Sequence, residues 1–133
     1  MIFVDSSVWV DYFNGRSSAE TNYLDELLGK EPIVVGDLVL IEVLQGFKRD
    51  SDYNTAKKLL TSLEVFTLGG QEIAIKSAAN FRLLRKKGIT VRKTIDVLIA
   101  TFCIERKLTL LHSDKDFDPF HEYLNLGNAL PDD

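Results

Sequence analysis

Four carboxylates stand in stretches of the sequence that are otherwise apolar. Asp5 and Asp114 each follow a short apolar run, in "MIFVDSS" and "LTLLHSD", of the kind that forms a buried strand. Glu42 is the only polar residue in "LVLIEVL", and Asp96 is the only one in "IDVLIA". Because an unpaired ionised carboxylate is costly to bury, these four are the first candidates for a functional site.

Three of these residues also have a purely structural explanation. Asp5 could cap a following helix, Asp96 could complement the dipole in the first turn of another, and Asp114 could form a turn. Glu42 is harder to explain in this way, since a glutamate in the middle of an apolar helix caps nothing.

A divalent cation would account for all four residues together. Carboxylates gathered at one edge of a sheet repel one another and raise each other's pKa unless a cation joins them. Mg²⁺ and Mn²⁺ bind carboxylate oxygens and water. The sequence therefore predicts a metal site to which Asp5 contributes a ligand.

The surrounding elements alternate between strands and helices. Apolar runs predict strands at 2–4, 32–36, 64–68 and 108–112, and helical patterns occupy 6–15, 17–30, 37–48, 51–63, 71–88 and 95–107. This alternation indicates βαβ units and a mostly parallel sheet covered on both faces. We expect one three-layer α/β/α domain over 1–133, with ligands bound at the carboxyl ends of the strands.

Local signals also predict where helices begin. Ser17 and Glu20 have the spacing of a capping box, and the other predicted caps are Asp37, Ser51 and Thr94.

Composition narrows the class of protein. The chain has 133 residues, 45% hydrophobic and 27% charged, which favours a folded domain over disorder. No segment approaches the roughly 20 apolar residues of a membrane helix, and a strand at residue 2 leaves no room for a signal peptide, so we expect a cytoplasmic protein. A single cysteine, Cys103, excludes an internal disulfide and a cysteine-rich zinc site.

The charge is unevenly distributed. A net charge of -4 argues against a nucleic-acid partner, yet 73–95 contains no Asp or Glu and carries seven basic residues: Lys76, Arg82, Arg85, Lys86, Lys87, Arg92 and Lys93. A local basic surface can bind phosphates whatever the total charge, although a solvated helix face would give the same pattern.

Four segments in this order resemble the PIN-domain ribonucleases, specifically the VapC-type toxins of toxin–antitoxin pairs: "FVDSSVWVDYF", "EVLQG", "TIDVLIA" and "LLHSDKDFD". The resemblance spans nearly the whole chain. It implies an α/β/α sandwich and Mg²⁺-dependent endoribonuclease activity, with Mn²⁺ as a possible substitute. It also implies a homodimer and inhibition by a VapB-type antitoxin.

The resemblance also assigns residues. It implies metal ligands at Asp5, Glu42, Asp96 and Asp114, with Asp116 as a supporting acid and the hydroxyls of Ser6 and Ser113 beside the metal. The loop "SDKDFD" leaves open whether Asp114 or Asp116 faces the metal. In the implied reaction a metal-activated water attacks a phosphodiester, and either Glu42 or Asp116 takes its proton.

Other classes of function fit less well. A receiver-like phosphoacceptor would need an Asp closing its third strand, where this chain reads "EVFTLGG", and a haloacid dehalogenase-type phosphatase would need a second Asp after Asp5-Ser6. A non-catalytic RNA- or protein-binding module would leave Glu42 and Asp96 unexplained. A PIN-like nuclease that processes RNA without being a toxin remains an alternative.

We expect several further residues to have a structural role and to take no part in the reaction. Cys103 is expected in the core, and His112 and His121, which lack ligand spacing, are expected to be structural or exposed. The sequence leaves open whether Trp9, Tyr12 and Phe13 belong to the core or to an interface.

Overall fold

The computed structural model describes residues 1–132 and contains one five-stranded parallel sheet in the order β3-β2-β1-β4-β5. The strands are β1 (Ile2–Val4), β2 (Ile33–Gly36), β3 (Glu64–Phe66), β4 (Thr109–Leu111) and β5 (Gly127–Asn128). The helices are α1 (Ser6–Phe13), α2 (Ala19–Leu27), α3 (Asp37–Leu44), α4 (Asp50–Thr61), α5 (Gln71–Lys86), α6 (Thr94–Arg106), the 3₁₀ helix η1 (Lys115–Phe117) and α7 (Asp118–Tyr123).

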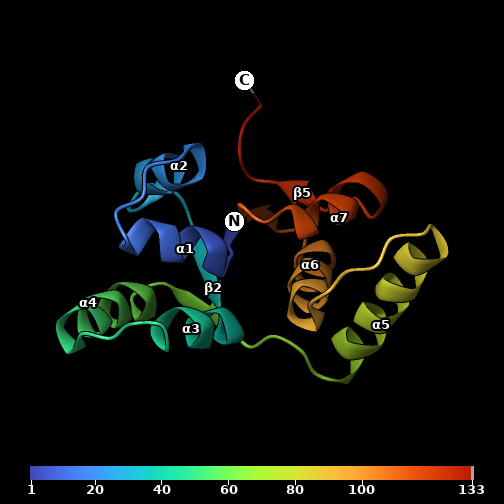
Figure 1. The fold of residues 1–133 in the computed structure, drawn as a ribbon, viewed down its shortest axis with the longest axis horizontal. Coiled ribbons are helices and arrows are strands. Elements are labelled where there is room, and N and C mark those ends of the chain that lie inside the picture. Colours follow the sequence, from blue (N-terminus) through green and yellow to red (C-terminus); the bar gives the residue numbers. More distant parts are fainter. Residues whose placement is uncertain (133) are drawn as a thin grey trace.

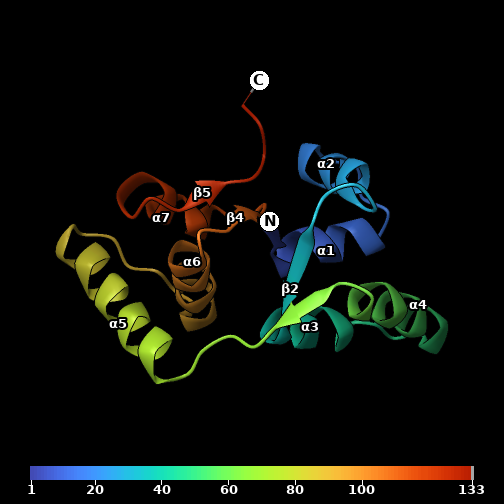
Figure 2. The same ribbon diagram turned by 180° about the vertical axis from the view of Figure 1, so that it is seen from behind.

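The helices form two layers around this sheet. Helices α1 to α4 gather on one side, and α5 to α7 lie on the other (Figures 1 and 2). This arrangement follows from right-handed crossovers: the chain moves from β1 through β2 to β3, then returns across the sheet to β4 and β5. The predicted α/β/α sandwich with a parallel sheet is confirmed.

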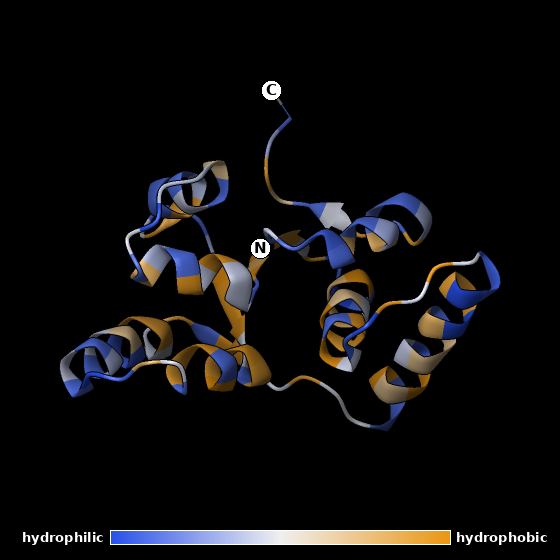
Figure 3. Cartoon of the chain, viewed as in Figure 1, coloured by the Kyte–Doolittle hydropathy of each residue, from blue (hydrophilic) through white to orange (hydrophobic). Residues whose placement is uncertain are grey.

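The apolar core lies between these layers. All four residues of β2 are buried, and α6 buries seven of its residues, so α6 is the buried helix that its sequence predicts. Figure 3 shows β2 and much of α6 in the hydrophobic colour. Among residues 1–132, no helix is both long enough and apolar enough to cross a bilayer.

All four predicted helix caps are wrong. The capping box of α2 joins Ser18 and Thr21, one residue later than predicted: the Thr21 N–H donates to Ser18 Oγ over 3.1 Å, and the Ser18 N–H donates to Thr21 Oγ1 over 2.9 Å. Ser51 and Thr94 lie within the first turns of α4 and α6. Arg49 and Lys93 occupy the cap positions.

Asp37 is not a cap either, since it is the first residue of α3 and Gly36 holds the cap position. Its Oδ1 accepts hydrogen bonds from the N–H groups of Leu38 and Leu68, over 2.8 and 3.1 Å. Asp37 therefore ties the start of α3 to the segment that leaves β3.

The C-terminal segment is more regular than the sequence indicates. Beyond the break after β4, the chain forms η1, α7 and the two-residue strand β5. Phe117 and Phe120 are fully buried there. These elements are too short for hydrophobic periodicity to reveal them, and they brace the loop that carries Asp114.

Candidate metal centre

The candidate site lies at the carboxyl ends of β1 and β4. These strands are parallel neighbours, with Val4 beside Leu111, so the residues that follow them meet at one edge of the sheet. Four of the five predicted acids line one pocket of about 300 Å³, together with both predicted hydroxyl residues: Asp5, Glu42, Asp96, Asp114, Ser6 and Ser113. The structure thus gathers residues from four separate segments of the chain.

Asp5 caps α1 and also lines the pocket. Its Oδ2 accepts hydrogen bonds from the Ser7 N–H over 3.0 Å and from the Ser7 hydroxyl over 2.7 Å. Burial raises the pKa of Asp5, and the hydrogen bonds from Ser7 act in the opposite direction. The structural explanation of Asp5 is therefore correct without excluding a role in the pocket.

Ser7 is a contributor that the sequence interpretation overlooked. Its hydroxyl donates to Asp5 and also accepts the N–H of Ser113 over 3.2 Å. One side chain therefore joins the start of α1 to the loop after β4. The run of two serines directly after Asp5 was the only local signal for this link.

Asp96 is the acid whose surroundings most favour a bound cation. It is buried at 5% exposure, and among residues 1–132 its Oδ2 has no hydrogen-bond partner. Burial, followed by the negative charges of Asp5 and Asp114, raises the pKa of Asp96 to about 7. A buried carboxylate oxygen without a donor is costly, and a proton or a metal ion would remove that cost.

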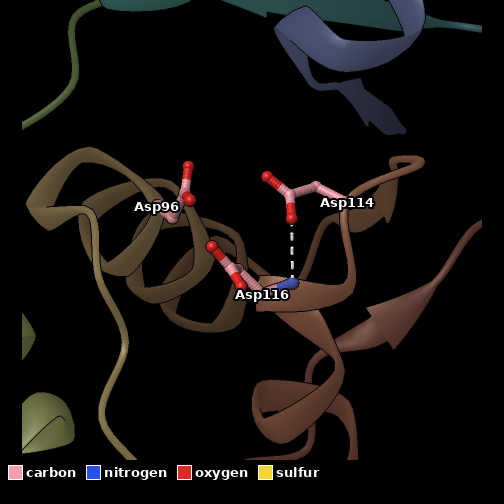
Figure 4. A group of neighbouring side chains, drawn as sticks. All are labelled: Asp96, Asp114 and Asp116. Atoms are coloured by element: carbon pink, nitrogen blue, oxygen red, sulfur yellow. Dashed lines mark hydrogen bonds between the residues drawn. The ribbon is translucent and has the colours of Figure 1, made fainter.

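Asp96, Asp114 and Asp116 form the tightest acidic group. Each offers one carboxylate oxygen, and the three oxygens lie within 4.8 Å of one another (Figure 4). The Asp116 N–H donates to Asp114 Oδ1 over 2.9 Å, so the backbone of the loop orients Asp114. Both aspartates of the loop therefore face Asp96, and three carboxylates with room for water fit a hard divalent cation.

Glu42 lies on another wall of the same pocket, on α3, and is not part of this group of three. It is only half-buried, and its neighbour Ile41 is 55% exposed, so the expectation of a glutamate enclosed by an apolar helix is wrong. Burial raises the pKa of Glu42, and the charge of Asp5 adds to the rise.

Two basic side chains form ion pairs with the acidic group. The Lys93 ammonium lies 4.0 Å from Asp114 Oδ2, and the Arg92 guanidinium lies 3.4 Å from Asp116 Oδ2. The remaining members of the basic stretch are spread along α5 and the turn after it, where Lys76 pairs with Glu72 and Glu105. The stretch therefore divides into a pair at the pocket and a separate helix surface.

His112 and His121 are bonded to each other, with their Nε2 atoms 2.7 Å apart. The Asp114 N–H donates to His112 Nδ1 over 3.3 Å, which places the His112 proton on Nε2. His121 then accepts at Nε2 and donates from Nδ1 to the carbonyl of Leu126, over 2.8 Å. The two histidines are structural, as expected, and they connect the Asp114 loop to the segment before β5.

The structure also shows where the three aromatic residues of α1 and Cys103 lie. Trp9 is fully buried and stacks on Phe13 with ring centroids 5.8 Å apart, while Tyr12 and Phe13 are partly buried against the core. Cys103 is fully buried, as predicted. Burial raises the pKa of its thiol, which is the opposite of what a nucleophilic cysteine needs.

Comparison with known proteins gives relatives over the whole chain. The PIN domain family matches residues 2–121. The chain is 32% identical over 132 residues to VapC ribonuclease Mb1587 of Mycobacterium bovis and to ribonuclease VapC11 of Mycobacterium tuberculosis, covering 97% of this chain and 98% of each relative.

The fold matches as well. The VapBC2 structure of Rickettsia felis, bound to a DNA fragment from its promoter, superposes with a TM-score of 0.72 at 22% identity, covering 96% of this chain and 97% of that one. A parallel sheet of this order, the acidic pocket at its carboxyl edge and the family match agree. The chain belongs to the PIN-domain family and, within it, to the VapC ribonucleases.

Proposed function

We propose that this chain is a Mg²⁺-dependent endoribonuclease, with Mn²⁺ as a substitute ion, and that it acts as the toxin of a toxin–antitoxin pair. The observation that carries the metal proposal is Asp96, whose buried Oδ2 has no donor within the described residues and whose carboxylate belongs to a close group of three. The ribonuclease proposal is supported by relatives that are named ribonucleases and that match this chain over 98% of their own length.

The proposed metal ligands are Asp5, Glu42, Asp96 and Asp114, with Asp116 beside them. When bound, a divalent cation lowers the pKa of a coordinated water and offsets negative charge on the phosphodiester. Ser7 holds Asp5 in position, and the backbone of the η1 loop holds Asp114.

Glu42 is the better candidate for the proton acceptor. Asp116 is paired with Arg92 and belongs to the group of three, so its carboxylate is already engaged by neighbouring charges. Glu42 stands outside that group, and its burial and the nearby Asp5 raise its pKa. Its carboxylate is thus suited to take a proton from an attacking water.

The proposed partners are RNA, a second copy of this chain and a VapB-type antitoxin, in the cytoplasm. The solved VapBC2 complex of Rickettsia felis supports a heteromeric assembly. An antitoxin could inhibit by placing an Arg or Lys among the carboxylates, because such a side chain would supply the positive charge that they require. We also propose that the chain acts as one nuclease domain.

Cleavage of RNA with and without Mg²⁺ tests the nuclease proposal. We expect the wild type to cut only with the ion, Asp96→Asn to be inactive, and Asp118→Asn, an exposed aspartate on α7, to cut normally. Equal cleavage by wild type and Asp96→Asn, in preparations free of wild-type enzyme, would contradict the assignment.

Co-expression tests the toxin proposal separately. The small reading frame beside the gene is expected to co-purify with this chain, to suppress cleavage and to relieve growth arrest. If the chain cuts RNA but causes no arrest and binds no such partner, an RNA-processing nuclease becomes the better description.

A further inference from the structure

We propose that Lys93 is the counter-ion of Asp114 when no metal is bound, and that metal binding releases its ammonium to contact an RNA phosphate. This inference rests on the proposed function and assigns a positioning role to one lysine of the chain. It links metal loading to RNA binding through a single side chain.

Lys93 is placed at the acidic pocket by the fold. It occupies the cap position of α6, with extended backbone, three residues before Asp96. Its side chain lines the pocket, and its ammonium lies 4.0 Å from Asp114 Oδ2. Burial raises the pKa of both Glu42 and Asp96, and the Lys93 ammonium opposes that rise, so its charge reaches both sides of the pocket.

The contact between Lys93 and Asp114 is easily exchanged. The Lys93 side chain is 61% exposed, and an exposed ion pair at this distance is weak. Its flexible stem allows the ammonium to swing away while the backbone stays fixed in the cap of α6. Arg92 holds Asp116 in a similar pair, with its own side chain 80% exposed.

A metal ion and the ammonium compete for the same carboxylate. Asp114 offers an oxygen to the group of three, within 4.8 Å of the oxygens of Asp96 and Asp116. A divalent ion there would bind the carboxylate of Asp114, offset its negative charge and repel the Lys93 ammonium. The displaced Lys93 would remain at the pocket edge, where the phosphate of a bound RNA strand is the anion it would meet.

Metal affinity tests the first half of this inference. We would titrate Mn²⁺ into wild type, Lys93→Met, Lys93→Arg and Lys115→Met, and follow free Mn²⁺ by electron paramagnetic resonance. Lys115 is the matched control, because it is exposed at the start of η1, between Asp114 and Asp116, and none of the ion pairs within residues 1–132 includes it. We expect Lys93→Met to bind Mn²⁺ about two- to fivefold more tightly, the range for an exposed pair, and the other two variants to match the wild type.

RNA binding tests the second half. The probe is a single-stranded oligonucleotide with 2′-O-methyl groups and phosphorothioate linkages, checked for integrity after each titration. In the wild type, Mn²⁺ should steepen the dependence of log K on log salt by about 0.7 more than the bound ion does by itself, the value for one added phosphate contact. Lys115→Met should show the same steepening as the wild type, and the steepening in Lys93→Met should be smaller by about 0.7.

If a folded Lys93→Met protein binds Mn²⁺ no more tightly than the wild type, Lys93 does not compete with the metal ion for Asp114. If Mn²⁺ steepens the salt dependence of RNA binding as much in Lys93→Met as in the wild type, Lys93 does not contact a phosphate. Failure of the metal site itself would be distinct, since wild type and Asp96→Asn would then both ignore Mn²⁺. A Lys93→Arg protein that behaves like Lys93→Met would also count against the inference, because arginine keeps the charge.

Discussion

Replacing Asp96 by Asn should stabilise the metal-free protein, although Asp96 is a proposed metal ligand. Burial and the charges of Asp5 and Asp114 raise the pKa of Asp96 from its ordinary value of 3.8 to about 7. A carboxyl group with a higher pKa in the folded state binds its proton more tightly there, so folding stability falls as pH rises between these two values. Asparagine keeps the shape of the side chain and cannot ionise, so it avoids this loss.

The magnitude follows from the two pKa values. At about 1.36 kcal/mol per pKa unit, a rise from 3.8 to about 7 corresponds to about 4 kcal/mol at most. Water reaches the pocket and screens this charge, so we expect about 2 kcal/mol. The gain should be near zero at about pH 4, grow towards about pH 7 and stay constant above it.

Urea denaturation in EDTA at several pH values measures this gain. The exposed control Asp118→Asn should stay within about 0.5 kcal/mol of wild type throughout. Saturating Mg²⁺ or Mn²⁺ should reverse the order of stability, because wild type gains about 2.7 kcal/mol at a hundredfold excess over the dissociation constant and Asp96→Asn gains much less. A metal-free Asp96→Asn protein that is less stable than wild type at about pH 8, or a difference independent of pH, would refute this reasoning.

Four further outcomes are expected. Asp5→Asn should abolish cleavage and keep the cap of α1, whereas Asp5→Ala should also lose about 1 kcal/mol of stability; urea denaturation and an RNA cleavage assay separate the two effects. Glu42→Gln should lose part of the rise in melting temperature that Mg²⁺ gives the wild type, and an undiminished rise would remove Glu42 from the metal site. Reversing Arg85 and Lys86 to Glu should weaken RNA binding and flatten its dependence on salt, while an unchanged slope would mark that face of α5 as solvated surface. Native protein should not react with a thiol reagent at Cys103 until denatured, since the thiol is fully buried and its pKa is raised.

Much of the fold could be read from short-range patterns. Continuous apolar runs such as 33–35 predict strands covered on both faces, and the helical stretches between them predict parallel crossovers. The positions of Asp5 and Asp114, one and three residues beyond such strands, placed both at the same edge of the sheet, where the structure has them. These inferences succeed because strand period, helix length and strand direction are properties of neighbouring residues.

Helix starts and the last elements were less predictable. Several residues near each start could serve as a cap, and the choice of Ser18 over Ser17 depends on where the incoming chain turns. Strand β5 has two residues, and it exists because β4 offers an edge to which it can bond. Neither feature has a local pattern that distinguishes it.

The sequence by itself determined that the chain forms a parallel α/β/α sandwich with carboxylates at one edge. Only the tertiary structure decided that Asp96 meets both Asp114 and Asp116, that Glu42 is half-exposed on another wall, and that Lys93 reaches into the pocket. The physical reason is that distances between side chains from separate segments depend on strand register and on how α3 and α6 pack against the sheet. Those quantities belong to the assembled core and to no single stretch of residues.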